Sequence, residues 1–306
     1  MKPVTLDPGT FAGLRHIHPP RASRSESFLG IDDATCIRCP DEPCVQFTPQ
    51  EVERANSTQV CPVGAITEAS APTGPIIDDS CFGCGICVVR CPVGALKLNL
   101  NAIPPVQVQR PDSESSRPAV DADDFAVGRN ESSKGAHWDR SVWEGWADRL
   151  KVNTRFQSQG TFYPLVAILF TLAGIPARLA AAGDTSNRID LVLIHHQSSL
   201  PVEIKSPTES DIINVKSVQQ ALENRVVLDQ RAFFPARRND SSLVVGFAYP
   251  PDRSGVTELV DDIFKAFGIR IGLVSLADLY LIALKSILAD SRFMRTDLVT
   301  LKGTLR

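Results

Sequence analysis

The sequence predicts two folded domains of different classes: an α+β cysteine-rich domain, followed by an α/β domain with a mixed central sheet flanked by helices. All eight cysteines of the 306-residue chain lie between positions 36 and 91. A segment rich in proline and serine follows them, and from His137 onward helical and strand patterns alternate. The length agrees with this division, because a domain commonly has roughly 100 to 200 residues.

We expect four consecutive segments. They are a flexible arm at residues 1–27, the cysteine-rich domain at 28–102, a linker at 103–136 and the α/β domain at 137–306. Charge differs between the halves: residues 1–136 contain 12 Lys and Arg against 17 Asp and Glu, whereas residues 137–306 contain 20 against 18. The small positive balance of the second half does not by itself indicate nucleic-acid binding, which usually shows as a strongly basic patch.

The cysteines form two matching runs. The second run reads Cys81-Phe-Gly-Cys84-Gly-Ile-Cys87-Val-Val-Arg-Cys91-Pro92, which matches the pattern C-x2-C-x2-C-x3-C-P. The first run is looser and consists of Cys36, Cys39 and Cys44, then Cys61 after sixteen intervening residues. Both runs end in Cys-Pro-Val-Gly-Ala. The segment is therefore a duplicated half-motif.

At these residues the chain resembles the bacterial two-[4Fe-4S] ferredoxins. In that family three closely spaced cysteines hold one cluster, and the cysteine before the proline reaches across to the other. The resemblance implies one [4Fe-4S] cluster on Cys61, Cys81, Cys84 and Cys87. It implies a second [4Fe-4S] cluster on Cys36, Cys39, Cys44 and Cys91.

Two glycines fit this pattern, and one spacing departs from it. A loop around a cluster aims backbone N–H groups at sulfur and uses positive φ angles, so Gly83 and Gly85 are suitable residues. Between Cys39 and Cys44 the first run has two residues more than the second has between its second and third cysteines. We expect this cluster to be more exposed, differently tuned in potential or more easily lost.

Zinc and disulfides are the alternatives for these cysteines. Zinc sites favour two separated C-x2-C pairs over a compact run that ends in Cys-Pro. Disulfides suit secreted chains, but no apolar signal-peptide core follows Met1. The longest apolar stretch, Phe162 to Ile175, is shorter than the ~20 residues of a membrane helix. We therefore expect a cytoplasmic protein with no membrane partner.

The second half should fold as an alternation of helices and strands, each bounded by a turn or a change of period. The expected helices are Val152–Leu172, Ile213–Phe233, Val256–Phe267 and Leu276–Ala289. The expected strands are Arg178–Ala182, Arg188–His195, Leu200–Lys205, Ser242–Tyr249 and Ile269–Val274. On the helix Ile213–Phe233, we expect Val215, Val218, Leu222 and Val226 to share the buried face.

Three charged residues in two of these strands could form a metal site. Glu203 and Lys205 point to the same face of their strand, because side chains alternate. A hairpin turning about Gln197 and Ser198 would place Asp190 opposite Lys205. Two carboxylates beside one ammonium group suit Mg²⁺ and a water molecule. A solvated strand face is the alternative.

Here the chain resembles the PD-(D/E)xK nuclease superfamily, whose restriction-endonuclease-like core has an Asp-bearing strand, a Glu-x-Lys strand and a helix in this order. The resemblance implies that Asp190 and Glu203 bind Mg²⁺ or Mn²⁺ and that Lys205 positions or deprotonates the attacking water. It gives Gln219, or its neighbour Gln220, an orienting role on the following helix. The family often has a glutamate on its first helix, whereas here Glu144 is the nearby candidate.

These observations lead to a main hypothesis and two alternatives. The main hypothesis is a Mg²⁺-dependent phosphodiesterase, a DNA endonuclease of a restriction, defence or repair system, with DNA a better candidate substrate than RNA. The first alternative is an electron-transfer ferredoxin subunit whose C-terminal domain only docks a redox partner or other subunits of a complex. The second is a subunit that binds nucleic acid without cleaving it. We expect Trp138, Trp143 and Trp146 to pack against the domain body instead of stacking on bases.

Overall fold

The computed structural model describes residues 29–32, 36–37, 39, 42–52, 58–68, 74–78, 80–98, 140–180, 189–194, 198–231, 240–288 and 298–305. The predicted arm at 1–27 and the predicted linker at 103–136 lie outside these residues, as does Trp138. No helix in the described part of the chain is both long and apolar enough to cross a membrane. A cytoplasmic location stays a prediction.

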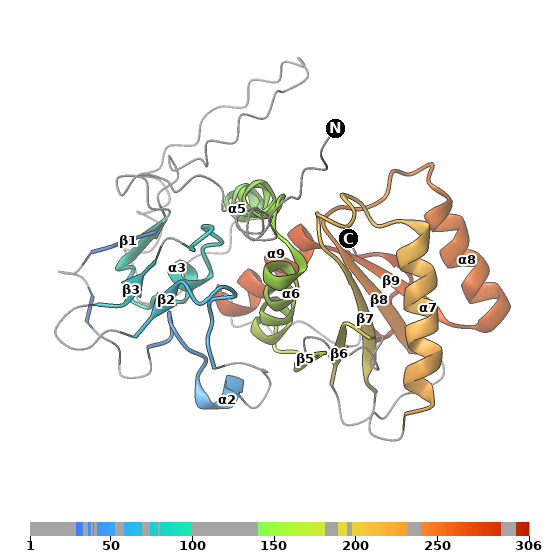
Figure 1. The fold of residues 1–306 in the computed structure, drawn as a ribbon, viewed down its shortest axis with the longest axis horizontal. Coiled ribbons are helices and arrows are strands. Elements are labelled where there is room, and N and C mark those ends of the chain that lie inside the picture. The colour runs from blue at the N-terminus through green and yellow to red at the C-terminus, as the bar shows by residue number, and fades with distance from the viewer. Residues whose placement is uncertain are drawn as a thin grey trace, which may run out of the picture.

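The cysteine-rich module contains two small antiparallel strand pairs (Figure 1). Strand β1 (Leu29–Ile31) pairs with β4 (Leu96–Leu98), and β2 (Ile66–Thr67) pairs with β3 (Ile76–Ile77). The short helices α2 (Pro49–Val52) and α3 (Ile86–Arg90) complete the module.

The two Cys-Pro-Val-Gly-Ala repeats adopt the same local structure. In both, the glycine amide donates to the carbonyl of the cysteine three residues earlier, from Gly64 to Cys61 and from Gly94 to Cys91. Both glycines have a φ of 68°. The alanine that follows is buried in each repeat, and a strand begins directly after it. The duplication seen in the sequence is thus a duplication of structure.

The second half is an α/β domain built on a mixed sheet (Figure 1). Among the described residues the strand order is β10-β9-β8-β7-β6-β5. Their bounds are β5 Ala177–Leu179, β6 Leu191–Leu193, β7 Leu200–Lys205, β8 Ser241–Gly246, β9 Arg270–Ser275 and β10 Gly303–Thr304. Strands β5, β6 and β7 pair antiparallel, and β7 to β10 pair parallel.

Helices cover both faces of this sheet. Helices α7 (Val215–Asp229) and α8 (Gly255–Phe267) lie on one face, and α6 (Gln159–Leu172) and α9 (Leu276–Leu288) on the other (Figure 1). Strands β7 and β8 are almost entirely buried, as expected for parallel strands covered on both faces. The sequence predicted both strands, β7 with the bounds that the structure has.

Three expectations about the elements were wrong in part. The helix expected at Val152–Leu172 is two helices, α5 (Arg140–Thr154) and α6, because a turn follows Thr154 and Ser158 forms the N-cap of α6. Helix α7 is shorter than expected and begins after a capping box formed by Asn214 and Ser217. The edge strand β10 was not anticipated, since two residues show no period.

The expected buried face of α7 was correct for Val218 and Leu222, which pack in the core, but wrong for Val215 and Val226. Val215 and Val226 are 41% and 52% exposed, while polar Asn224 and Arg225 are buried. Arg225 is compensated by an ion pair with Asp229, at 2.7 Å. Because Asn224 and Arg225 find polar partners where they are buried, the apolar pattern alone identified only part of the buried face.

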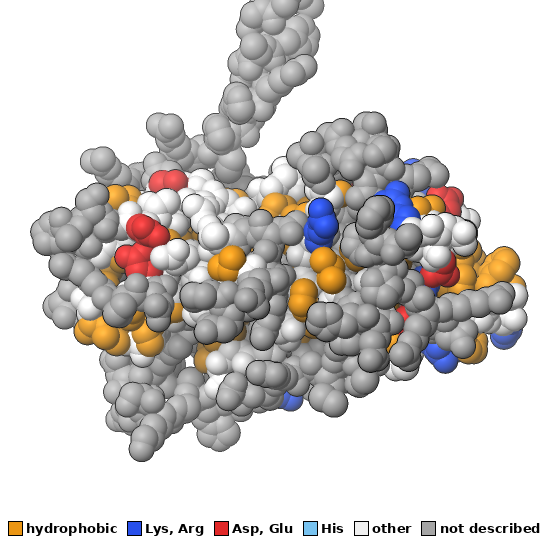
Figure 2. Space-filling view, turned by 90° about the horizontal axis from the view of Figure 1, so that it is seen from below, with side chains coloured by type: hydrophobic (Ala, Val, Ile, Leu, Met, Phe, Trp, Pro, Cys, Tyr) orange, Lys and Arg blue, Asp and Glu red, His pale blue; other side chains and the backbone are white. Residues whose placement is uncertain are grey.

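One apolar core joins the module to the sheet. Helices α5, α6 and α9 stand between them in Figure 1. Phe82, Ile86 and Val89 of the module belong to the same buried cluster as Leu150 of α5 and Tyr280 of α9. On the face shown in Figure 2, acidic side chains appear over the module, while the α/β domain shows Lys and Arg together with acidic side chains. This agrees with the charge difference seen in the sequence.

Candidate functional site

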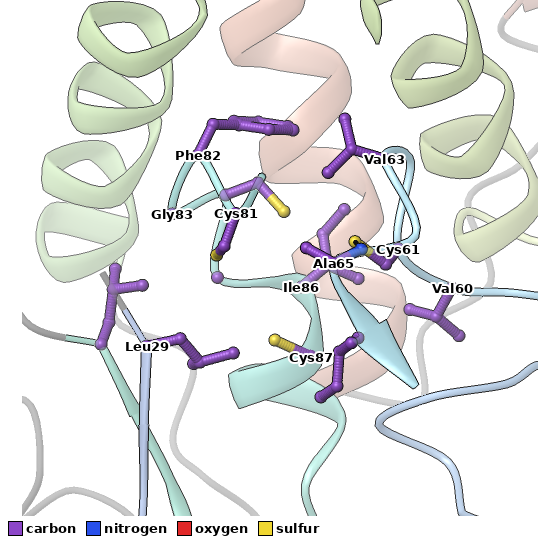
Figure 3. Close-up of a pocket in the computed structure, with 14 residues that line it drawn as sticks. Leu29, Val60, Cys61, Val63, Ala65, Cys81, Phe82, Gly83, Ile86 and Cys87 are labelled. Atoms are coloured by element: carbon purple, nitrogen blue, oxygen red, sulfur yellow. Dashed lines mark hydrogen bonds between the residues drawn. The ribbon is translucent and has the colours of Figure 1, made fainter. Parts of the chain in front are cut away.

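Four cysteines from both halves of the duplicated motif line one pocket of the module. Cys61 comes from the first run, and Cys81, Cys84 and Cys87 come from the second. Figure 3 shows the sulfur atoms of Cys61, Cys81 and Cys87 around a common space, with Leu29, Val60 and Phe82 among the apolar walls. We call these four residues the inner set. It is the set that the ferredoxin resemblance implied for one cluster.

The other four cysteines also come from both runs of the sequence and lie near one another. Burial first, and then the negative charge of Cys91, raises the pKa of the Cys44 thiol to about 11, with smaller contributions from Cys39 and Cys36. Cys91 therefore lies beside the first run although it ends the second. We call Cys36, Cys39, Cys44 and Cys91 the outer set.

Backbone N–H groups point at the sulfur atoms of the inner set. The Ala65 amide donates to Cys61 Sγ at 3.2 Å, and amides of Gly83 and Ile86 bond to Cys81 and Cys84. Gly83 and Gly85 have φ angles of 69° and 75°, as the sequence analysis expected. Hydrogen bonds to sulfur stabilise the thiolate form and tune cluster potentials. The donor set therefore fits an iron–sulfur cluster.

The protonation of the inner thiols points the same way. Burial, followed by the charges of neighbouring cysteines, raises the pKa of Cys84 and Cys87 well above the ordinary value. Converging buried thiolates repel one another unless a cation lies between them. A metal supplies that charge and deprotonates coordinating thiols. These buried thiols are thus suited to metal more than to free thiol chemistry.

Helices of the α/β domain enclose the inner set. The Tyr280 hydroxyl of α9 donates to the Cys84 carbonyl at 2.7 Å, and Asn153 of α5 donates to the Gly83 carbonyl at 3.4 Å. Trp146 of α5 lies so close to Gly85 that a Cβ there would be 2.3 Å from its ring. Trp146 is 8% exposed, so the expectation of packing is confirmed for this residue.

An arginine of the module holds the loop of the outer set. Both terminal nitrogens of Arg90 lie 2.8 Å from the Glu51 carboxylate, and Arg90 Nε donates to the Pro43 carbonyl at 2.5 Å. Pro43 directly precedes Cys44, and Arg90 directly precedes Cys91. The ion pair therefore fixes one outer ligand relative to another.

The structure also brings Asp190, Glu203 and Lys205 together at the end of β7. Lys205 Nζ lies 2.8 Å from Glu203 Oε1, and Asp190 Oδ2 accepts from the Ile204 amide at 2.9 Å. Burial and then the charge of Glu203 raise the pKa of Asp190 to about 7. The expected hairpin register was wrong: Leu191 pairs with Val202, so the next step places Asp190 opposite Glu203 instead of Lys205.

Helix α7 does supply a partner for this group, but it is not Gln219. Asn224 Nδ2 donates to Glu203 Oε2 at 2.8 Å, whereas Gln219 is exposed on α7. Glu144 is exposed on α5, which packs against α9. Helical spacing could have placed Asn224 on the face of Ser217 and Ala221, had the buried face been identified correctly.

Two further residues near this group were missed by sequence reasoning. Glu209 Oε1 lies 3.7 Å from Lys205 Nζ, and the Tyr163 hydroxyl lies 2.9 Å from the Ile204 carbonyl and 3.2 Å from Glu209 Oε2. Glu209 stands four residues after Lys205, a weak signal in a loop. In the described part of the chain, no three His, Cys, Asp or Glu side chains converge as ligands of a single ion.

Comparisons with known proteins concern the cysteine-rich module. A family model described as a 4Fe-4S binding domain matches residues 75–97. The chain contains a 4Fe-4S ferredoxin-type domain. Over 79 residues it is 35% identical to the "Aliphatic sulfonate oxidoreductase, polyferredoxin-like subunit" of Pyrococcus furiosus. That alignment covers 24% of this chain and 38% of the relative, so the chain spans well under half of that protein's length.

No solved structure matches the chain. None of the matches points to a nuclease. For the α/β domain, the structure shows a mixed six-stranded sheet between helices among the described residues.

Proposed function

We propose that the protein is an iron–sulfur electron-transfer subunit, in which the inner and outer sets each hold a [4Fe-4S] cluster and exchange electrons with a partner protein. This was the first alternative of the sequence analysis. The observation that carries it is the crossed arrangement of the cysteines, in which Cys61 joins the second run and Cys91 joins the first. The polyferredoxin-like name of the relative supports it.

The residues of the chain have separate tasks in this function. A bound cluster supplies one-electron chemistry at each set. Amide donors such as Ala65 stabilise negative charge on sulfur, and apolar walls such as Phe82 keep water from the inner set. Ile37, next to Cys36, is 67% exposed. In this proposal a partner approaches the outer set beside Ile37.

Iron and sulfide analysis of protein purified without air tests this proposal. Two four-iron clusters require about eight iron and about eight sulfide per chain. Reduction with dithionite should bleach the visible absorbance and give an electron paramagnetic resonance signal. Stoichiometric zinc without sulfide would contradict the proposal.

A second candidate function is the metal-dependent nuclease of the main hypothesis, and the convergence of Asp190, Glu203 and Lys205 favours it. The order α6-β5-β6-β7-α7-β8 also agrees with the restriction-endonuclease-like core that the resemblance implied. In this function Asp190 and Glu203 would hold Mg²⁺ or Mn²⁺, which polarises a phosphoryl oxygen when bound. Lys205 would position the attacking water, and Asn224 would orient Glu203.

Asp190→Asn gives a test of the metal site that does not depend on finding the substrate. Because the folded pKa of Asp190 is raised, the folded protein binds this proton more tightly than the unfolded chain. The stabilisation that protonated Asp190 gives the folded state is present at low pH and is lost as pH rises through about 7. Asp190→Asn should therefore be more stable than the parent at pH values above this, and Mg²⁺ should raise only the parent's melting temperature. A Mg²⁺ effect equal in both proteins contradicts the site.

Cleavage assays complete the test of this candidate. DNA and RNA are incubated with Mg²⁺ or Mn²⁺ and with oxidised or reduced protein. Asp190→Ala, Glu203→Ala and Lys205→Ala should each abolish cleavage and leave the fold intact, because each removes a charge at the reacting centre. Gln219→Ala serves as a control on the exposed face of α7. No cleavage by the parent on any of these substrates removes the nuclease candidate.

A further inference from the structure

A second and larger cavity lies between the module and the α/β domain. Its volume is about 490 Å³. Phe47, Gln59 and the segment 61–64 form one wall, and residues of α6 and β5 form the other. Small-molecule sites commonly have about 300 to 1,000 Å³ and occur at domain interfaces. Figure 2 shows hydrophobic side chains at the surface between the two halves. We call this cavity the interdomain cleft.

Among the described residues, the lining of the interdomain cleft is mainly apolar and carries no charge. None of the described residues around it is Lys, Arg, His, Asp or Glu. Its walls are mainly apolar side chains, including Pro164, Ala167, Ile168 and Leu179. Burying a charged ligand group without a partner is costly. The cleft therefore fits an uncharged, largely apolar molecule, and not a phosphate-bearing nucleotide cofactor.

The cleft shares a wall with the inner set. Cys61 and Val63 line both the interdomain cleft and the cysteine pocket. A molecule in the cleft would therefore touch a residue that, under the proposed function, is a ligand of the inner cluster. Electron transfer from the inner cluster to this molecule would then pass only through Cys61 and Val63.

We propose that the interdomain cleft binds an uncharged quinone-type molecule and that the inner cluster reduces it. This rests on the proposed electron-transfer function. Each of two reduced clusters gives up one electron and returns to its oxidised state. The quinone takes these two electrons and two protons from water and becomes the hydroquinone. Gln59 is exposed on the rim of the cleft, so water reaches the bound molecule from that side.

Two residues of α6 allow the cleft to be filled. Gly160 is exposed, and a Cβ built there meets only Ser158 Oγ, at 3.7 Å. Gly160→Trp therefore adds an indole to the cleft without crowding the backbone. Ala167 lines the cleft and is 7% exposed. Ala167→Phe is therefore a second variant, which fills the cleft from its buried side. Gly255 is also an exposed glycine in the first turn of a helix, α8, and Gly255→Trp is the matched control.

Calorimetric titration of the oxidised protein with menadione, an uncharged naphthoquinone, tests binding. The probe for comparison is 1,4-naphthoquinone-2-sulfonate, which has a similar ring system and a negative charge. We expect menadione to bind at least about tenfold more tightly than the sulfonate, and Gly160→Trp and Ala167→Phe to weaken menadione by about tenfold or more. Gly255→Trp should bind as the parent does. Equal binding of both probes, or unchanged binding in both filled variants, overturns the inference.

Reoxidation of dithionite-reduced protein by menadione tests the electron transfer. The rate should saturate with menadione concentration in the parent and rise linearly in Gly160→Trp, since an unbound quinone reacts only by collision. A linear dependence in the parent contradicts the inference.

The two proposals fail in different ways. Clusters with full iron and sulfide but no menadione binding overturn the cleft assignment alone. Absence of clusters overturns the electron-transfer function, and with it the reduction step, while calorimetry still reports on the cleft.

Discussion

The inner and outer cysteine sets arise from the same duplicated motif but have different surroundings. The inner set is closed by residues of the α/β domain, above all Trp146 and Tyr280. The outer set is held by its own module, through the ion pair of Arg90 and Glu51, and Ile37 beside it is exposed. Burial raises the pKa of Cys84 further than that of Cys44. One motif thus provides two sites with different surroundings, one closed by helices of the α/β domain and one held by the module itself.

Under the proposed function, this difference would give the two sites different tasks. A partner protein would approach the outer set, while the inner set adjoins the interdomain cleft and the core shared with the sheet. Between Cys39 and Cys44, Glu42 has a φ of 39°. A left-handed φ in a residue other than glycine is strained.

Replacing Cys61 or Cys91, the cysteines that cross to the other run, should have the largest effect on cluster content. Cys91→Ser should remove the outer cluster and Cys61→Ser the inner cluster, each with loss of about half of the iron and sulfide. Electron paramagnetic resonance of the remaining cluster identifies which one was lost. If Cys91→Ser instead damages the cluster of Cys81, Cys84 and Cys87, ligation is local and the two sets are wrongly drawn.

Gly85→Ala should break the packing of the inner set against α5. The new Cβ would lie 2.3 Å from the Trp146 ring, at a residue with φ 75°. Strain and overpacking together should lower the free energy of unfolding by about 2 to 4 kcal/mol, measured by urea denaturation. Gly64→Ala is the matched control, because its φ is 68° but its Cβ would meet Gln59 Oε1 at 3.5 Å. Equal losses of unfolding free energy in both variants would show that the contact with Trp146 does not contribute to the cost of Gly85→Ala.

Tyr280→Phe should affect the inner cluster alone. The variant keeps the buried ring and removes the hydrogen bond to the Cys84 carbonyl, at a cost of about 1 to 2 kcal/mol. The reduction potential of the inner cluster should shift, while that of the outer cluster stays constant. A redox titration followed by electron paramagnetic resonance measures both. Equal shifts in the two potentials would contradict a local contact.

Glu51→Gln, which weakens the ion pair beside the outer set, should have the smallest effect on stability. Burial raises the pKa of Glu51, but its hydrogen bonds and the charge of Arg90 outweigh this, so the folded pKa lies below 4.5. The stabilising effect of the carboxylate is thus present above this pH and is lost as pH falls through the folded value. At neutral pH the variant should lose about 1 kcal/mol. Urea denaturation should show that the difference from the parent vanishes in acid.

The sequence predicted the parts of the molecule that short-range rules control. The cysteine spacing carried the ferredoxin resemblance that implied both four-cysteine sets, and strand patterns between turns indicated β7 to β9. Gly83 and Gly85 were identified because their positive φ angles are required locally. The hairpin register was misjudged because the residues before Ser198 carry no two-residue turn signature.

Contacts between distant segments could not be predicted from one sequence. Tyr280 and Cys84 are 196 residues apart, and no periodicity links them. Trp146 was expected to be buried, but not against Gly85 of a cluster loop. Glu209 and Tyr163 join Lys205 only because α6 and the loop after β7 meet at the end of that strand. Such contacts depend on how whole elements pack.

We expect the apolar core that joins the module to α5, α6 and α9 to make the two halves one cooperative unit. Removing the module would expose the faces of Leu150 and Trp146, and removing the helices would expose Phe82 and Ile86. Metal binding contributes to folding free energy, so iron in the inner set should stabilise the sheet as well as the module. Heating should therefore release the inner cluster and unfold the sheet in a single transition.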